Sequence, residues 1–248
     1  MCGICGFNWN DEALAREMAG RITHRGPDQE GVFADRHMTL AFRRLSIIDL
    51  SENGAQPMAN EDGSIHLVFN GEIYNFQELR DQLEKKGHRF RSRTDSEVIL
   101  HAYEEYGDDC VLHLRGMFGF AIYDQPRRRL LLARDRIGIK PLYYTFSNGR
   151  LLFASEIKSI LADPQVERRL DHQALYDYLG FEFVPAPRTM FDGIRKLPAG
   201  HLLVHEQGGI DVRQYWDLRF TGHGPVPSMD EAVEELRGQL DAAVKSHL

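Results

Sequence analysis

Apolar and polar positions along the chain repeat with two different spacings, which separates expected strands from expected helices. Alternating or short continuous apolar runs predict strands, whereas apolar residues spaced three and four apart predict helices. Helices are expected over residues 11–21, 76–86, 94–106, 156–161, 171–181 and 229–244. Strands are expected over residues 3–9, 38–43, 66–69, 118–123, 130–133, 142–146, 151–154, 201–205 and 213–216.

From Met117 to Ala154 the expected strands are short and follow one another across turn-forming residues. This spacing favours antiparallel hairpins, because parallel strands would need long crossover connections. The basic run Arg127-Arg128-Arg129 follows Asp124-Gln125-Pro126, which predicts a solvated hairpin turn. The pattern therefore predicts an α+β protein, with two antiparallel sheets and helices outside them.

Two signals mark the ends of elements. Thr94 followed by Glu97 has the spacing of a capping box, and the helix dipole would favour Asp95 beside it. Gly222 to Pro227 reads as a linker, and the helix expected after it has apolar residues at helical spacing. We therefore expect one domain over residues 1–221, and over 222–248 a linker and the first helix of a further domain.

Composition narrows the class of protein. The chain has 248 residues, 42% of them hydrophobic, and a formal net charge of -7. An apolar run of about 20 residues, which a membrane span needs, does not occur in the sequence, and acidic residues in the first thirty positions exclude a signal-peptide pattern. We expect a cytoplasmic globular protein that binds neither nucleic acid nor membrane.

Three cysteines are too few for a disulfide framework. Cys2 and Cys5 form a C-x-x-C, but on a strand their side chains point to opposite faces. The sequence offers no second C-x-x-C or close histidine pair to complete a tetrahedral site, so we expect no metal at these cysteines. Cys110 lies in an amphipathic stretch and is expected in the core.

Cys2 can combine nucleophile and base in one residue. Removal of Met1 would leave a thiol and an α-amine on Cys2, and the amine has a reference pKa of about 7.7–8.0. Such an amine can accept the thiol proton near neutral pH, which is how N-terminal nucleophiles are activated without a separate histidine.

Several ordered blocks extend this interpretation. They are Met1-Cys2-Gly3-Ile4-Cys5-Gly6, His24-Arg25-Gly26-Pro27-Asp28, Arg43-Arg44-Leu45-Ser46-Ile47-Ile48-Asp49, Phe69-Asn70-Gly71-Glu72-Ile73-Tyr74-Asn75, Thr94-Asp95-Ser96-Glu97-Val98-Ile99, Arg115-Gly116-Met117-Phe118, the run from Ala133 to Tyr144, and Ala154-Ser155-Glu156-Ile157-Lys158. With these blocks the chain resembles the class II glutamine amidotransferases, and within them the glutaminase half of asparagine synthetases. The resemblance implies an N-terminal-nucleophile (Ntn) hydrolase αββα sandwich.

The resemblance also implies roles for single residues. Cys2 would attack the glutamine carboxamide, and the Asn70 side chain and the Gly71 N–H would stabilise the oxyanion. Glycine at position 71 would let the chain approach the substrate closely. His24 would be structural, in a turn near the site.

Recognition of free glutamine needs partners for both charges of its amino-acid head. By resemblance, Arg44 binds the α-carboxylate, and Glu72 and Asp95 face the α-ammonium. Backbone groups would complete the pocket at Leu45, Ile47 and Ile48. Each side chain could also have a purely structural role. Arg44 could cover apolar surface, Glu72 could lie on a strand in solvent, and Asp95 could interact with the N-terminus of its helix.

The resemblance implies partners and limits as well. Glutamine hydrolysis needs no cofactor, whereas ATP and Mg²⁺ belong to a synthetase domain with a Ser-Gly-Gly-x-Asp-Ser phosphate loop, a motif that these 248 residues do not contain. In the full enzyme that domain would use the ammonia to aminate aspartate. Another acid could be the acceptor, as in peptide or exopolysaccharide-related amidotransferases, or the chain could be a non-catalytic regulatory module. A homodimer is compatible with the sequence.

Overall fold

The computed structural model describes residues 2–46, 52–220 and 227–247, which form two compact units divided between Trp216 and Asp217. The second unit contains helix α7 (Met229–Lys245), which begins with a capping box between Ser228 and Glu231. The domain boundary predicted at 221/222 and most of the expected linker fall in residues 221–226, outside the described residues. Within the described ranges, no helix has the length and apolar character needed to cross a bilayer.

The first unit is built on two six-stranded sheets whose strand pairs are all antiparallel. The first sheet has the order β10-β8-β9-β1-β3-β2. Its strands are β1 (Gly3–Phe7), β2 (Gln29–Ala34), β3 (Thr39–Arg44), β8 (Tyr143–Ser147), β9 (Arg150–Ala154) and β10 (Ile194–Lys196). The second sheet has the order β12-β11-β7-β6-β5-β4. Its strands are β4 (Met58–Ala59), β5 (Ile65–Ile73), β6 (Gly116–Asp124), β7 (Arg129–Arg134), β11 (His201–Glu206) and β12 (Gly209–Gln214).

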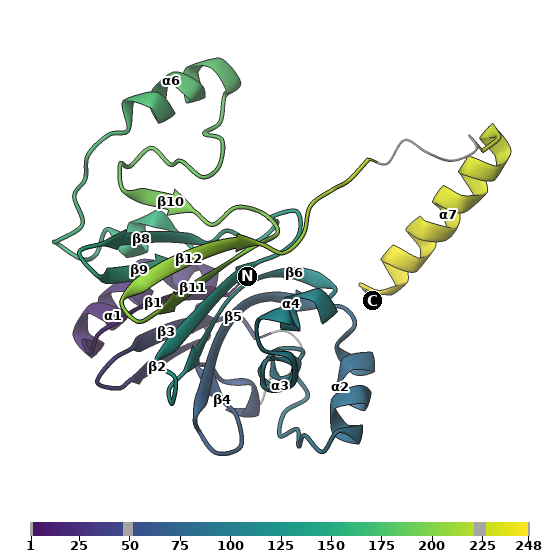
Figure 1. Cartoon of the computed structure of the whole chain (residues 1–248), viewed down its shortest axis with the longest axis horizontal. Coiled ribbons are helices and arrows are strands. Elements are labelled where there is room, and N and C mark those ends of the chain that lie inside the picture. The colour runs from purple at the N-terminus through teal and green to yellow at the C-terminus, as the bar shows by residue number, and fades with distance from the viewer. Residues whose placement is uncertain (1, 47–51, 221–226, 248) are drawn as a thin grey trace. The chain divides into compact units, whose positions relative to one another are not determined.

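Helices α1 (Glu12–Gly20) and α5 (Ile157–Ile160) cover the outer face of the first sheet, and α2 (Phe76–Lys85), α3 (Glu97–Tyr106) and α4 (Cys110–His113) cover that of the second (Figure 1). Helix α6 (His172–Phe181) stands away from both sheets, and Ala174 is its only buried residue. Residues of α1 and α5 pack with β1 and β9 in one buried cluster, and residues of α2, α3 and α4 pack with β5 and β6 in another.

A third buried cluster lies between the sheets, and strand β7 shows how alternation builds it. Leu130 and Leu132 belong to this middle cluster, whereas Leu131 and Ala133 belong to the cluster under α2 and α3. Successive side chains of a strand point to opposite faces, so one strand serves two core layers. The expected α+β class with two antiparallel sheets and outer helices is confirmed.

Some elements differ from their prediction. β2, β4 and β10 were not predicted, and the last expected strand, over 213–216, lies instead over Gly209–Gln214. The capping box predicted at Thr94 is wrong, because α3 begins at Glu97 and the Glu97 carboxylate accepts hydrogen bonds from Arg91 N and Ser92 N, both at 2.7 Å. Tertiary partners for the Glu97 carboxylate thus replace a local cap.

The basic turn is confirmed in part. β6 ends at Asp124 and β7 begins at Arg129, so Arg127 and Arg128 lie in the hairpin turn as expected. Arg129, however, is buried in the strand and forms an ion pair of 2.6 Å with Asp108. The Arg129 guanidinium therefore has a structural role, and of the three arginines only Arg127 and Arg128 are exposed to solvent.

Candidate functional site

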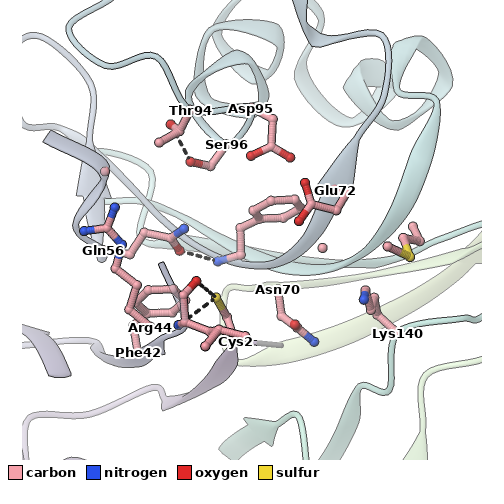
Figure 2. Close-up of a pocket in the computed structure, with 15 residues that line it drawn as sticks. Cys2, Phe42, Arg44, Gln56, Asn70, Glu72, Thr94, Asp95, Ser96 and Lys140 are labelled. Carbon is pink, nitrogen blue, oxygen red and sulfur yellow. Dashed lines mark hydrogen bonds between the residues drawn. The ribbon is translucent and has the colours of Figure 1, made fainter. Parts of the chain in front are cut away.

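A pocket of about 180 Å³ gathers residues from both sheets and from the turn that leads into α3 (Figure 2). It is smaller than the roughly 300–1,000 Å³ typical of drug-sized ligand sites, so its size suits a small metabolite. The residues that line it are Cys2, Phe42, Arg44, Leu45, Gly54, Gln56, Phe69, Asn70, Gly71, Glu72, Thr94, Asp95, Ser96, Met117 and Lys140.

Cys2 lies at the start of β1, where the pairing of Gly3 with Arg43 places it beside the end of β3. The Leu45 N–H donates a hydrogen bond to Cys2 Sγ at 3.4 Å, and the thiol faces Leu45 O at 3.7 Å. Burial raises the pKa of the Cys2 thiol, although the Leu45 hydrogen bond opposes this shift. The thiol therefore needs a base to become a good nucleophile near neutral pH.

Cys5 and Cys110 lie elsewhere, as expected. Both are buried free thiols in the two outer core clusters, and burial raises the pKa of Cys5 to about 12. Cys2 and Cys5 thus belong to different faces of the first sheet, which agrees with the geometry predicted for the C-x-x-C. Of the three cysteines, Cys2 alone lines the pocket.

Asn70 and Gly71 lie on β5 beside Cys2 in the pocket lining. The Asn70 side chain is buried, and among the described residues its Nδ2 has no hydrogen-bond partner. A buried amide donor left unpaired by the protein costs free energy unless a ligand uses it. Gly71 is required by β6, because a Cβ there would lie 2.2 Å from Met117 O. The close approach inferred for Gly71 is therefore at least in part to a neighbouring strand.

Arg44, at the end of β3, is buried, and Gly54 leaves the room for its guanidinium. Arg44 Nη1 donates to Gln29 Oε1 at 3.2 Å. A Cβ at Gly54 would lie 2.4 Å from Arg44 Nη2 and 2.9 Å from Thr94 Cγ2. Because the Arg44 guanidinium lines the pocket and binds Gln29, a role limited to covering apolar surface does not explain its position.

Glu72 and Asp95 place two carboxylates on the same pocket, toward the side opposite Arg44 in Figure 2. Asp95 is buried, and its Oδ2 accepts a hydrogen bond from Ile73 N at 2.8 Å. Burial raises the pKa of Asp95 to about 7 despite that hydrogen bond, and the Glu72 charge adds to the shift. Burial also raises the pKa of Glu72 above its usual range. Such a pair favours a cationic ligand.

Lys140 is a pocket residue to which the sequence assigned no role. It is buried, and burial lowers the pKa of its ammonium while the charge of Glu72 acts in the opposite direction. Lys140 lies in the Ala133–Tyr144 block, and an isolated lysine between two apolar segments was the available signal. Gln56 was also missed, and its Oε1 accepts a hydrogen bond from Phe69 N at 2.6 Å, which anchors it beside β5.

The turn that begins at His24 contacts the backbone of Cys2 through Arg25. Arg25 Nε donates to Cys2 O at 2.9 Å, and Arg25 Nη1 binds Glu156 Oε1 at 3.0 Å. His24 Nε2 also lies 2.8 Å from Glu156 Oε1 and does not line the pocket, which agrees with the structural role expected for it. Arg25 is therefore a positioning residue for Cys2 that the sequence did not single out.

The pocket thus brings together seven of the nine residues predicted for the site: Cys2, Arg44, Leu45, Asn70, Gly71, Glu72 and Asp95. Ile47 and Ile48 lie outside the described residues, as does Met1. The backbone roles assigned to these two isoleucines, and the α-amine that loss of Met1 would create, stay predictions.

The sequence of this chain is similar to those of known proteins. Residues 1–216 match a family model described as a glutamine amidotransferase domain. Asparagine synthetase [glutamine-hydrolyzing] 1 of Bacillus subtilis is 41% identical, over all of this chain and 40% of that protein. Asparagine synthetase B of Escherichia coli is 35% identical, over 100% of this chain and 40% of that protein. Amidase chry2 of Gibberella zeae is 39% identical, over 100% of this chain and 39% of that protein. The chain thus spans about two fifths of the length of these relatives.

Solved structures agree on the fold. The glutamine phosphoribosylpyrophosphate amidotransferase from B. subtilis superposes with a TM-score of 0.61 at 18% identity, covering 87% of this chain and 49% of that one. At this identity the likeness concerns the fold alone, and it confirms the expected Ntn hydrolase sandwich. Because the family model matches all of the first unit, the chain belongs to the glutamine amidotransferase domain family.

Proposed function

We propose that this chain hydrolyses glutamine to glutamate and ammonia, with the Cys2 thiol as nucleophile. The observation that carries the proposal is one small pocket holding the thiol, the buried amide of Asn70, a guanidinium and two carboxylates. Each matches one part of glutamine: the carboxamide carbon, the oxyanion, the α-carboxylate and the α-ammonium. Among the residues that the structure describes, the Asn70 Nδ2 has no hydrogen-bond partner.

The reaction follows from these positions. Cys2 Sγ forms a bond to the carboxamide carbon while the thiol proton passes to the α-amine exposed by loss of Met1. Asn70 Nδ2 donates to the oxyanion, and the tetrahedral species collapses as the amine returns the proton to the departing nitrogen. Ammonia leaves, and water then hydrolyses the Cys2 thioester to glutamate and the free thiol. The raised pKa of the thiol is the reason that a base is needed.

The use of the ammonia is a second part of the proposal. Relatives named asparagine synthetase are more than twice as long as this chain. We propose that within such a protein the ammonia aminates aspartate in an ATP- and Mg²⁺-dependent domain of the same chain. The alternative is another carboxylic acid as the acceptor, and one relative is named an amidase and not an asparagine synthetase. These 248 residues should carry only the glutamine half-reaction.

The test is glutamine hydrolysis with and without the thiol. Cys2→Ala should abolish ammonia release, because it removes the nucleophile. It should leave the thermal unfolding temperature unchanged, because Cys2 is only half-buried and lies near the N-terminus. A glutamine-mimicking diazo-ketone should add its mass to the Cys2 peptide of the parent chain. The Cys5→Ala variant serves as the matched control and should still be labelled. Labelling at Cys5 or Cys110 in place of Cys2 would refute the assignment of the nucleophile.

The same samples, given ATP, Mg²⁺ and aspartate, should form no asparagine. Intact mass should show that Met1 is absent from active material, because a retained Met1 would block the amine. A preparation that keeps Met1 and still hydrolyses glutamine at full rate would refute the role of the α-amine while leaving Cys2 as the nucleophile.

A further inference from the structure

A cluster of two histidines and two glutamates contributes no residue to the lining of the glutamine pocket. Glu61 is in the turn between β4 and β5, His88 follows α2, and His101 and Glu104 are on α3. Potential ligand atoms of Glu61, His88 and His101 all lie within 4.8 Å of one another. Three segments distant in sequence thus converge on one point.

The shortest contacts run through the Nδ1 atoms of both histidines. Glu104 Oε2 lies 2.8 Å from His101 Nδ1 and 3.4 Å from His88 Nδ1, and Glu61 Oε2 lies 3.9 Å from His101 Nδ1. In a tetrahedral zinc site with bonds of about 2.0–2.2 Å, neighbouring ligand atoms are separated by about 3.3 Å. These are three of the six distances between the ligand atoms of a four-ligand site. Two of them differ from this value by about half an ångström, and the third fits.

The two glutamates each use their second carboxylate oxygen in a hydrogen bond to another part of the protein, as metal-binding carboxylates commonly do. Glu104 Oε1 accepts a hydrogen bond from Asn60 Nδ2 at 2.7 Å, and Glu61 Oε1 accepts one from Arg89 N at 3.2 Å. Both carboxylates are therefore fixed through one oxygen and present the other to the histidines. Such outer contacts orient the ligands of protein metal sites.

The histidines have matching outer contacts. His101 is 1% exposed, and its Nε2, which has no hydrogen-bond partner in the described part of the chain, lies 3.8 Å from Glu97 Oε1. His88 Nε2 lies 3.5 Å from Glu105 Oε2. A metal on each Nδ1 would leave the proton on each Nε2, facing a carboxylate in both cases. Carboxylate, histidine and metal in this order are a recurring arrangement.

The local charge favours a cation. Four carboxylates surround the two rings, and of the nearby cations Lys86 is bound to Glu105 at 2.6 Å while Arg91 binds backbone carbonyls.

We propose that Glu61, His88, His101 and Glu104 form a binding site for a divalent transition-metal cation of the zinc class. Two imidazole nitrogens and two carboxylate oxygens suit Zn²⁺ or Co²⁺ better than Ca²⁺ or Mg²⁺, which prefer oxygen ligands alone. The bound cation ties α3 to the β4–β5 turn and to the segment after α2.

The experiment uses the 248-residue chain carrying Cys2→Ala, because an active-site thiol could itself bind metal, whereas Cys5 and Cys110 are buried. After treatment with chelator, Zn²⁺ is titrated calorimetrically, and Co²⁺ is followed by its visible absorption. We expect one ion per chain, the intense bands of a tetrahedral Co²⁺ site, and a higher thermal unfolding temperature with Zn²⁺.

Variants locate the ion. His88→Gln and Glu61→Gln, both at partly exposed side chains, should each weaken Zn²⁺ binding at least about tenfold. His24→Gln is the matched control, because His24 also contacts a carboxylate but has no second histidine beside it, and it should bind Zn²⁺ like the parent. Absence of one-to-one uptake would overturn the proposal, and so would equal affinity in His88→Gln and His24→Gln. The cluster would then be an ion-paired histidine that needs no metal.

Discussion

The raised pKa of Asp95 makes glutamine binding depend on pH in a direction that can be worked out. If the ligand ammonium requires the charged carboxylate, the apparent dissociation constant scales with 1 + 10^(pKa − pH). With a pKa of about 7, glutamine should bind about tenfold more weakly at pH 6 than at pH 8, or about 1.4 kcal/mol. The carboxylate is the binding form, so affinity is close to its full value at about pH 8, is about half of it near pH 7, and is lost as pH falls further.

The assay should separate binding from chemistry. Calorimetry on Cys2→Ala between pH 5.5 and 8.5 removes the titration of the nucleophile. It also reports protons: near pH 7, where Asp95 is half charged, glutamine binding should release about half a proton per site, seen by comparing buffers with different ionisation enthalpies. The double variant Cys2→Ala/Asp95→Asn should bind weakly with little dependence on pH. A constant affinity between pH 6 and 8 in Cys2→Ala, or an unchanged pH profile after Asp95→Asn, would refute the reasoning.

The raised pKa of Asp95 also makes the stability of the folded protein depend on pH. The pKa of Asp95 is higher in the folded state than its ordinary value of 3.8, so the folded protein binds this proton more tightly than the unfolded chain. The contribution of Asp95 to stability therefore rises as pH falls from about 7 toward 4. Asp95→Asn keeps an oxygen for the Ile73 N–H and removes the buried charge, so it should raise the thermal unfolding temperature at pH 8 while weakening glutamine binding.

Three further variants test the other pocket residues. Arg44→Lys keeps the charge but loses the bidentate geometry, so the KM for glutamine should rise by at least about tenfold with a smaller effect on kcat, and unchanged kinetics would leave Arg44 a structural role. Gly54→Ala should displace the Arg44 guanidinium and raise KM at little cost in stability, whereas Gly20→Ala, where an added Cβ meets nothing within 4 Å, should leave KM alone. Asn70→Ala should lower kcat by about 10²–10³ with KM nearly unchanged, as measured by ammonia release, and an equal rise of KM would instead indicate ground-state binding.

The long elements were predictable because their own residues determine them. β7 has apolar residues at every position from Leu130 to Ala133, and α2 has Leu79 and Leu83 on its buried face. The missed strands lack such a signal. All six residues of β2 are only half-buried, in the sequence Gln-Glu-Gly-Val-Phe-Ala, and β2 is an edge strand whose pairing with β3 fixes it. A pattern of apolar residues cannot reveal a strand that is held mainly by its neighbour.

The site shows the same division. Cys2, Asn70 and Arg44 could be inferred because their chemistry and their resemblance to a family are written in short blocks of sequence. Gly54 could not, because its requirement comes from Arg44 and Thr94, ten and forty positions away in the chain. Arg25 was missed for a similar reason: its function is to bind the backbone of Cys2 and the carboxylate of Glu156, which only the folded chain brings together.

The arrangement of charge in the pocket explains how one small cavity could select an amino acid that is neutral overall. Asp95 and Glu72 repel each other, and Glu72 contributes to the raised pKa of Asp95. The Lys140 ammonium interacts with the Glu72 carboxylate and so relieves part of this repulsion. A ligand ammonium would relieve the rest, because it would allow both carboxylates to be charged in a buried place. We infer that a ligand without an α-ammonium leaves the repulsion between Asp95 and Glu72 in place. The repulsion within the protein would then contribute to discrimination against such ligands as much as the contacts with the ligand do.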